Sequence, residues 1–309
     1  MKKHIASLAL AIALAGCHNY HTHSHESNST VAAQNNYFGA YTLVDEKYGT
    51  KTTVTIDGDK RIMVTNALPN HETGHFPRKG NPNTISAQNK RYEIPLHPVF
   101  TGEVRWARET GVALNGVKFE PETAEVVVCE SGENYRVEAK QSFIDLGLDF
   151  NNAHVQPTGA YHYHGVPTGV VHAFDKGGDL VHIGFAHDGF AIYYSKSGAY
   201  KPGYRLIDET RTGTDCTYAN PRGIQDVKIN GEKKDGTYKS DWEYVKGLGD
   251  LDECNGREVN GQYAYFVTVE YPYVGRCLKG AFKEQRGGGP PPGRQRPPQG
   301  GRPPGPPRN

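Results

Sequence analysis

Short runs of alternating apolar and polar residues, broken every few positions by Gly, Pro or Asn, constrain the fold of this chain more than any other feature. The run 52–56 ends at Asp57-Gly58 and a second run, 61–65, follows, which is typical of two strands around a tight turn. Further strand candidates lie at 125–129, 161–164, 180–185, 190–194 and 262–269. Helical periodicity is hard to find after residue 20. We therefore expect a mainly β fold: a single β-rich domain with long irregular loops and few helices.

The N-terminal segment predicts export. Lys2 and Lys3 precede an apolar run at 5–15, as in a secretory signal peptide. The run ends in L-A-G-C, which resembles the bacterial lipobox, so we expect a lipoprotein signal peptide at 1–16 and lipidation of Cys17. Acyl chains on Cys17 would anchor the protein to a lipid bilayer. His18 stands where an aspartate would favour inner-membrane retention, which suggests the outer membrane of a Gram-negative bacterium. The alternative is an ordinary signal peptide with a chance cysteine.

The flanks differ in composition from the body. The segment 17–36 reads as a linker that either collects metal ions weakly or serves as a polar spacer, and its histidines are His18, His21, His23 and His25. The segment 283–309 is rich in Pro, Gly and Arg, so we expect a disordered tail, with contact to anionic lipid or cell wall as a second interpretation. The body, 37–282, suits one domain. A net charge of +1 gives no reason to expect a nucleic-acid partner.

Four cysteines remain after Cys17, namely Cys129, Cys216, Cys254 and Cys277. An even number in an exported protein predicts two disulfides, for which three pairings exist. Cys254 and Cys277 flank an expected hairpin, so we favour this pair, which leaves Cys129 with Cys216. A thiolate metal site is disfavoured because no two cysteines have C-x-x-C spacing.

The histidines predict a site. Of the 14 in the chain, six fall within 34 consecutive positions of the body. Successive side chains of a strand alternate between faces, so His162 and His164 share one face and Tyr161 and Tyr163 the other. An intervening Q-P-T-G turn could fold His154 back toward them. Three neutral imidazoles suit Zn or Cu(II). The alternatives are a hydrogen-bonded polar strand face and acid/base catalysis without a metal.

Two other stretches hold candidate ligands. His71 opens H-E-T-G-H, which has metalloprotease spacing, but Pro69, Gly74 and Pro77 oppose the helix that this motif needs. Asp188 lies in H-D-G between two apolar runs, where a tight turn is the simplest interpretation. We keep His71 and Asp188 as possible additional ligands of the same metal.

Several motifs resemble, in this order, those of the YHYH-domain family of exported proteins. They are N-A-L-P-N-H at 66–71, N-P-N at 81–83, L-N-G-V at 114–117, Y-H-Y-H at 161–164, H-D-G-F-A-I-Y at 187–193, L-D-E-C-N-G-R at 251–257 and Y-P-Y at 271–273. The resemblance covers about 60–280. It carries over, as motif positions, His154, His162, His164, Asp188, Asp252 and Asn255. It implies no particular reaction.

The leading interpretation is a membrane-anchored envelope lipoprotein whose YHYH domain binds Zn or Cu(II) through the clustered histidines. One alternative is a hydrolase acting on envelope glycan or peptide, either metal-dependent or using His as acid/base. For cleavage of a glycan, which needs two carboxylates, the candidates are Asp250, Asp252 and Glu253. A non-catalytic envelope binding or structural module is another. The chain has neither G-x-S-x-G nor G-x-x-x-x-G-K-[ST], which disfavours a serine hydrolase and a phosphate-loop enzyme.

Overall fold

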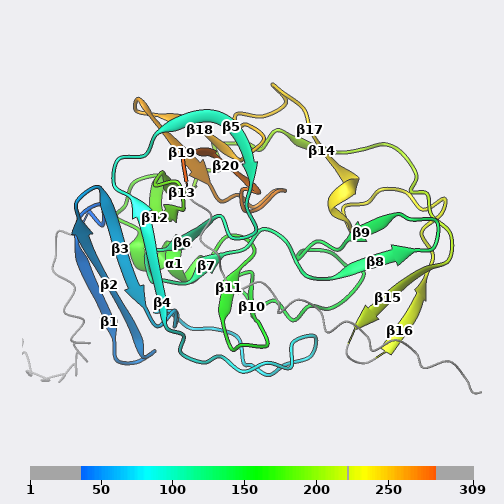
Figure 1. Ribbon diagram of the computed structural model, residues 1–309, viewed down its shortest axis with the longest axis horizontal. Helices are drawn as coiled ribbons and strands as arrows, with labels where there is room; N and C mark the ends of the chain where they lie inside the picture. Colours follow the sequence, from blue (N-terminus) through cyan, green and yellow to red (C-terminus); the bar gives the residue numbers. More distant parts are fainter. Residues whose placement is uncertain (1–35, 221–222, 283–309) are drawn as a thin grey trace, which may run out of the picture. The chain divides into compact units, whose positions relative to one another are not determined.

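The protein is built from short strands, as Figure 1 shows, in a computed structural model that describes residues 36–220 and 223–282. In this part of the chain there are twenty strands in five sheets, one α-helix, α1 (Thr168–Phe174), and one 3-10 helix, η1 (Lys239–Asp241). The largest sheet has eight strands in the order β10 (Ala153–Val155), β11 (Tyr161–Tyr163), β7 (Lys118–Phe119), β6 (Gly111–Ala113), β12 (Leu180–Ala186), β13 (Ala191–Ser195), β19 (Gln262–Phe266), β18 (Gly256–Val259). Two sheets have four strands each: one in the order β1 (Tyr41–Asp45), β2 (Thr50–Asp57), β3 (Lys60–Thr65), β4 (Lys90–Pro95), and the other in the order β16 (Gly223–Val227), β15 (Cys216–Asn220), β8 (Val126–Cys129), β9 (Asn134–Arg136). Two sheets are strand pairs: β14 (Tyr204–Leu206) with β17 (Trp242–Tyr244), and β20 (Cys277–Gly280) with β5 (Phe100–Trp106). The mainly β fold predicted from the sequence is confirmed.

The period-2 runs of the sequence form strands at the expected places. The hairpin β2–β3 turns at Asp57-Gly58, with Asp57 opposite Lys60, and buries alternate residues such as Val54 and Met63. The other predicted runs correspond to β8, β11, β12, β13 and β19, with bounds that differ by up to three residues. Helix α1 was not predicted. It has seven residues, too few for a periodic pattern, and it is held by burial of Val170 and Phe174 on one side.

The eight-stranded sheet carries the main hydrophobic core. Phe119, Tyr163 and Phe185 are each at most 1% exposed in this core. Burial of one such side chain contributes about 1.5–3 kcal/mol. A separate small core lies between β8, β9 and β15 and includes Tyr135 and Tyr218. All of the described residues fall in one compact unit of the chain.

Both favoured disulfide pairings are confirmed. Cys129 and Cys216 are register partners on β8 and β15 and are bonded to each other. Cys254 and Cys277 are also bonded, and the hairpin β18–β19 lies between them as expected. Each disulfide stabilises the fold mainly by restricting the unfolded chain.

Several predictions concern segments outside the described residues. These are the signal peptide at 1–16, lipidated Cys17, the linker histidines His18, His21, His23 and His25, and the tail at 283–309. Among the described residues, none of the helices has the length and apolar character needed to cross a bilayer.

Candidate metal centre

The hairpin β10–β11 places the first two histidines side by side. The two strands are antiparallel, and His154 lies directly opposite His162 in the register. The Q-P-T-G segment forms the turn that the sequence predicts. Gly159 closes it with a φ of 83°, and a Cβ at this position would lie 1.9 Å from Ser86 Oγ. Only glycine avoids both the left-handed backbone strain and this clash, so the turn fixes the hairpin register.

A second strand extends the histidine face. β7 runs parallel to β11 and pairs Lys118 with His162. The Glu120 backbone N–H continues the pairing by donating to the Tyr163 carbonyl at 3.0 Å. Because side chains alternate, Lys118 and Glu120 lie on the same face as His162 and His164. This histidine face is therefore assembled from three neighbouring segments, β10, β11 and β7.

The three histidines converge through one nitrogen each. His164 Nε2 lies 3.1 Å from His154 Nε2 and 2.9 Å from His162 Nε2. The three ligand atoms all lie within 4.8 Å of one another. His162 and His164 are each 2% exposed, and His154 is partly exposed. The arrangement can hold a metal ion, with His154 at its more accessible side. We call these three residues the triad.

Two of the three rings have their protonated nitrogen fixed by the backbone. His154 Nδ1 lies 2.8 Å from the Leu146 carbonyl oxygen, and His162 Nδ1 lies 3.3 Å from that of Ala160. A carbonyl oxygen only accepts hydrogen bonds, so both Nδ1 atoms carry a proton. In the neutral rings both Nε2 atoms then carry a lone pair. Proteins commonly orient metal-binding histidines in this way.

The three Nε2 atoms cannot satisfy one another by hydrogen bonding. A neutral His164 has at most one proton on Nε2, yet this atom faces the lone pairs of both other rings. His164 Nδ1 is also buried without a hydrogen-bond partner among the described residues. At least one lone pair is therefore left without a donor, which is unfavourable in a buried site. A cation at the point of convergence would remove this conflict.

The surroundings keep the triad neutral. Burial, followed by the charge of neighbouring imidazoles, holds the pKa of His162 and His164 well below 6.5. Burial also lowers the pKa of His154. Neutral imidazoles keep the lone pairs that metal ions require.

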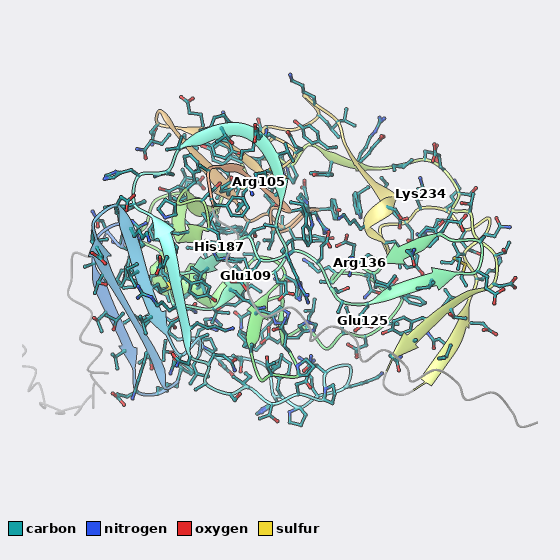
Figure 2. All side chains as sticks on the ribbon, in the orientation of Figure 1. Arg105, Glu109, Glu125, Arg136, His187 and Lys234 are labelled. Atoms are coloured by element: carbon teal, nitrogen blue, oxygen red, sulfur yellow. A yellow bond between two sulfur atoms is a disulfide. The ribbon has the colours of Figure 1, made fainter. Side chains whose placement is uncertain are left out.

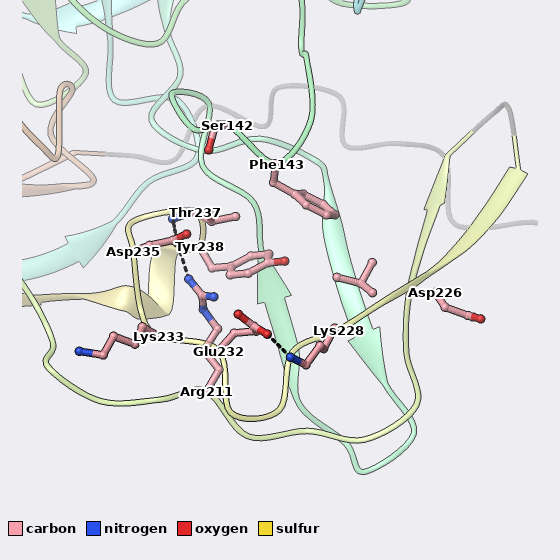
Figure 3. Close-up of a pocket in the computed structure, with 11 residues that line it drawn as sticks. Ser142, Phe143, Arg211, Asp226, Lys228, Glu232, Lys233, Asp235, Thr237 and Tyr238 are labelled. Carbon is pink, nitrogen blue, oxygen red and sulfur yellow. Dashed lines mark hydrogen bonds and ion pairs between the residues drawn. The ribbon is translucent and has the colours of Figure 1, made fainter.

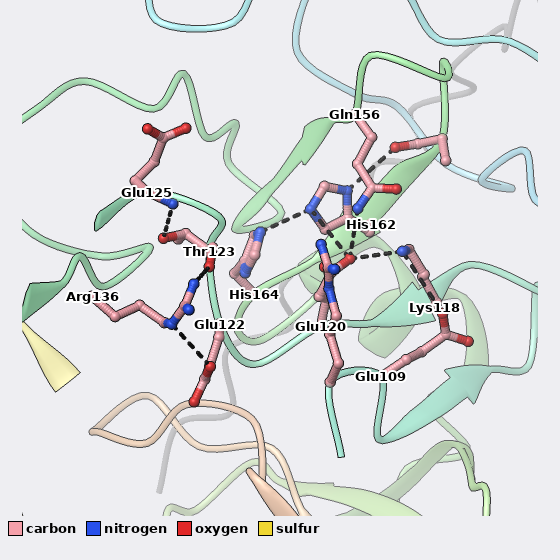
Figure 4. Close-up of polar contacts among 12 residues, drawn as sticks. Glu109, Lys118, Glu120, Glu122, Thr123, Glu125, Arg136, Gln156, His162 and His164 are labelled. Atoms are coloured by element: carbon pink, nitrogen blue, oxygen red, sulfur yellow. Dashed lines mark hydrogen bonds and ion pairs between the residues drawn. The ribbon is translucent and has the colours of Figure 1, made fainter. Parts of the chain in front are cut away.

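Glu120 is the acidic residue next to the triad. Its Oε2 lies 3.9 Å from His162 Nε2 and accepts hydrogen bonds from Lys118 Nζ at 2.7 Å and Gln156 Nε2 at 2.8 Å (Figure 4). Arg108 Nε donates to Oε1 at 3.3 Å. Burial acts to raise the pKa of Glu120, but Lys118 and the other neighbouring positive groups, Arg108 among them, together outweigh it, so this pKa lies below the usual value.

The tyrosines of the motif build the opposite face of β11. Tyr161 donates to Asp149 Oδ2 at 2.6 Å. The Tyr163 hydroxyl lies 2.7 Å from His71 Nε2 and accepts from Asn115 Nδ2 at 3.0 Å. We call this the tyrosine face.

His71 does not join the triad. Its Nδ1 donates to the Glu72 carbonyl at 2.9 Å, so its Nε2 accepts from the Tyr163 hydroxyl. The lone pair that a metal would need is therefore used on the tyrosine face. The segment around His71 has no helix, as Pro69 and Pro77 predict.

Asp188 also lies away from the triad. It follows β12 in the predicted turn before β13, and its Oδ2 accepts from the Tyr265 hydroxyl at 2.6 Å and the Gly280 N–H at 2.9 Å. These bonds tie the turn to β19 and β20. Burial raises the pKa of Asp188. Its neighbour His187 contacts Glu109 Oε1 at 3.2 Å, and Figure 2 labels this pair.

The remaining motif positions surround a disulfide. Asp252 accepts from the Cys254 and Gly256 N–H groups and from the Tyr263 hydroxyl. Asn255 has a φ of 62° and donates to the Phe266 carbonyl at 2.8 Å. Both side chains organise the chain at the Cys254–Cys277 bond, so the family motif combines structural positions with the histidines.

Three residues of the centre were not identified from the sequence: Lys118, Glu120 and Gln156. The alternation V-K-F-E at 117–120 predicts that Lys118 and Glu120 share a face, but not that this face adjoins His162. Gln156 was interpreted only as a turn residue.

Comparison with known proteins identifies the family but no characterised relative. The model of the YHYH protein family matches residues 91–280, which is 190 of the 309 residues. Neither the search of curated proteins nor that of solved structures finds a match. The matched segment contains the whole triad, Glu120, both disulfides and the tyrosines of β11. The chain belongs to the YHYH protein family.

Proposed function

We propose that this protein is a lipid-anchored envelope protein whose YHYH domain binds a divalent transition metal, Zn(II) or Cu(II), at His154, His162 and His164. The observation that carries the proposal is the convergence of the three Nε2 atoms, two of which have their lone pairs directed by Nδ1–H bonds to backbone carbonyls. Imidazole nitrogen suits both ions.

The N-terminal sequence supports the cellular setting of the proposal. L-A-G-C ending at Cys17 matches a lipidation signal, and the linker that follows is rich in histidine. Acyl chains on Cys17 would hold the domain at the outer membrane. The linker would collect metal ions and deliver them to the triad. Radiolabelled palmitate should appear in the protein and be absent after Cys17→Ser; labelling of both, or of neither, would contradict the anchor.

We favour binding over hydrolysis of a glycan or peptide. Hydrolysis requires a substrate groove beside the metal and a coordination position open to water. A cavity of about 370 Å³ is lined by residues such as Phe143, Arg211 and Tyr238 and includes none of the triad (Figure 3). Within it, Arg211 is already paired with Asp235. The burial of His162 and His164 supports a small ion site rather than a substrate groove at the triad.

The test is the metal content of purified full-length protein made without a histidine tag and with Asn at His18, His21, His23 and His25, so that only the domain binds metal. One equivalent of Zn or Cu should co-purify or load, and His162→Ala/His164→Ala should remove this equivalent. His71→Asn is the matched control, because His71 is buried nearby but bonded on the tyrosine face. Equal metal content in all three proteins would overturn the proposal.

A further inference from the structure

Glu120 occupies the position of a fourth ligand beside the triad. The register of β7 and β11 puts its side chain on the histidine face, and it is 4% exposed. Its Oε2 is 3.9 Å from His162 Nε2, and its charge acts on both His154 and His164. The carboxylate thus lies beside His162, and its charge also acts on the other two imidazoles.

Three separations between ligand atoms lie near those of a four-coordinate ion. Metal–ligand bonds of about 2.1 Å in a tetrahedron place the ligand atoms about 3.4 Å apart. The measured separations are 2.9 and 3.1 Å between imidazole nitrogens and 3.9 Å from nitrogen to Oε2. Each of these three lies within about 0.5 Å of the tetrahedral value. The three imidazole nitrogens together span up to 4.8 Å, so side chains would have to move to bring all four atoms onto one ion.

The hydrogen bonds of Glu120 leave room for a metal. An ionised carboxylate has about four acceptor positions. Lys118 and Gln156 use two of these at Oε2, and Arg108 uses one at Oε1. About one position remains, and it is on Oε1, so the carboxylate would turn to present this oxygen to the ion. Such outer contacts orient a ligating carboxylate in the same way that backbone carbonyls orient ligating histidines.

We propose that Glu120 is the fourth protein ligand, which completes a closed three-histidine, one-carboxylate site. This inference rests on the proposed function and deepens it. Four protein ligands leave no position for water on a tetrahedral ion, so the site would retain a metal rather than activate water. A hard carboxylate oxygen beside three imidazoles also favours Zn(II) and Cu(II) over soft Cu(I).

The test uses full-length protein in which His18, His21, His23 and His25 are replaced by Asn, so that only the domain binds. Glu120→Gln removes the charge and weakens the oxygen donor. Glu109→Gln is the matched control, since Glu109 also lies near Lys118, at 3.7 Å, but contacts His187 rather than the triad. Affinities are measured with Zn²⁺, and ligand geometry is followed through the visible spectrum of Co²⁺.

We expect Glu120→Gln to weaken Zn²⁺ binding about 100-fold or more and to change the Co²⁺ spectrum. Glu109→Gln should change neither. Equal affinities and spectra for the two variants would overturn the role of Glu120 while leaving the triad intact. A parent protein that binds no Zn²⁺ would instead overturn the proposed function, and this inference with it.

A crystal structure of the zinc-loaded parent protein provides an independent decision if Glu120→Gln fails to fold. The proposal expects a distance of about 2.0–2.2 Å between zinc and a carboxylate oxygen of Glu120. A water molecule bound to zinc, with Glu120 still held only by Lys118 and Gln156, would refute it.

Discussion

Replacing Tyr163 with Phe should separate stability from metal binding. Tyr163 is fully buried, and its hydroxyl donates to His71 Nε2 at 2.7 Å and accepts from Asn115 Nδ2 at 3.0 Å. The change keeps the ring that packs on Phe119 but removes both hydrogen bonds. The triad lies on the opposite face of β11, so its geometry should be unaffected.

The fall in the free energy of unfolding depends on which hydrogen bonds the two partners of the Tyr163 hydroxyl keep. Asn115 Nδ2 still donates to Asn70 Oδ1 at 3.1 Å, so its loss is about 1 kcal/mol. His71 Nε2 loses its donor in a buried position, which costs about 1–3 kcal/mol. Tyr163→Phe should therefore lower the free energy of unfolding by about 2–4 kcal/mol.

The assay is urea unfolding of metal-free protein, combined with Zn²⁺ titration of the folded state. Tyr200→Phe is the control, because Tyr200 is partly exposed and its hydroxyl has no hydrogen-bond partner among the described residues. The free energy of unfolding of this variant should fall by less than about 0.5 kcal/mol. Zn²⁺ affinity should be unchanged in both variants. A loss below about 0.5 kcal/mol for Tyr163→Phe, or a large fall in its Zn²⁺ affinity, would refute the division into two faces.

Three further changes probe other parts of the fold. Burial lowers the pKa of His182 to about 3, so as the pH drops from 6.5 toward 3 the imidazole is protonated in the unfolded chain before the folded one, and the free energy of unfolding falls. In urea unfolding, His182→Gln should make the fall in this free energy between pH 6.5 and 5 smaller by about 2 kcal/mol. The same fall in the variant as in the parent protein would contradict this. Removing the Cys129–Cys216 bond, which joins cysteines 87 positions apart, should lower the free energy of unfolding by about 3–5 kcal/mol in the same assay and leave the Zn²⁺ affinity unchanged. A weaker Zn²⁺ affinity would show that the disulfide also supports the triad. Gly159→Ala should cost about 1 kcal/mol or more and also weaken Zn²⁺ binding, because the hairpin turn sets the place of His154; unchanged affinity would show that the turn does not position this ligand.

Local features of the sequence were sufficient to predict strand β11 and the turn before it, although no strand was predicted at β10. The Q-P-T-G turn and strand alternation bring His154 opposite His162, and these depend only on residues close in the chain. The disulfide between Cys254 and Cys277 was predictable for the same reason, because it closes around one hairpin.

Long-range pairing accounts for what was missed. β7 has two residues and pairs with β11 across more than 40 positions of sequence, so no local pattern shows that Glu120 adjoins the triad. His71 and Asp188 were kept as possible ligands of the metal. Sequence spacing does not tell which face of β11 a distant segment packs against, so the sequence could not exclude them. Their hydrogen bonds to tyrosine hydroxyls, at Tyr163 and Tyr265, place them elsewhere.

The most direct test of the metal centre is isothermal titration of the purified full-length protein, carrying Asn at the four linker histidines, with Zn²⁺. The account predicts one tight site per chain that disappears in His162→Ala/His164→Ala while the folded state persists by circular dichroism. No tight site in the parent protein, or a site of equal affinity in the double variant, would contradict it.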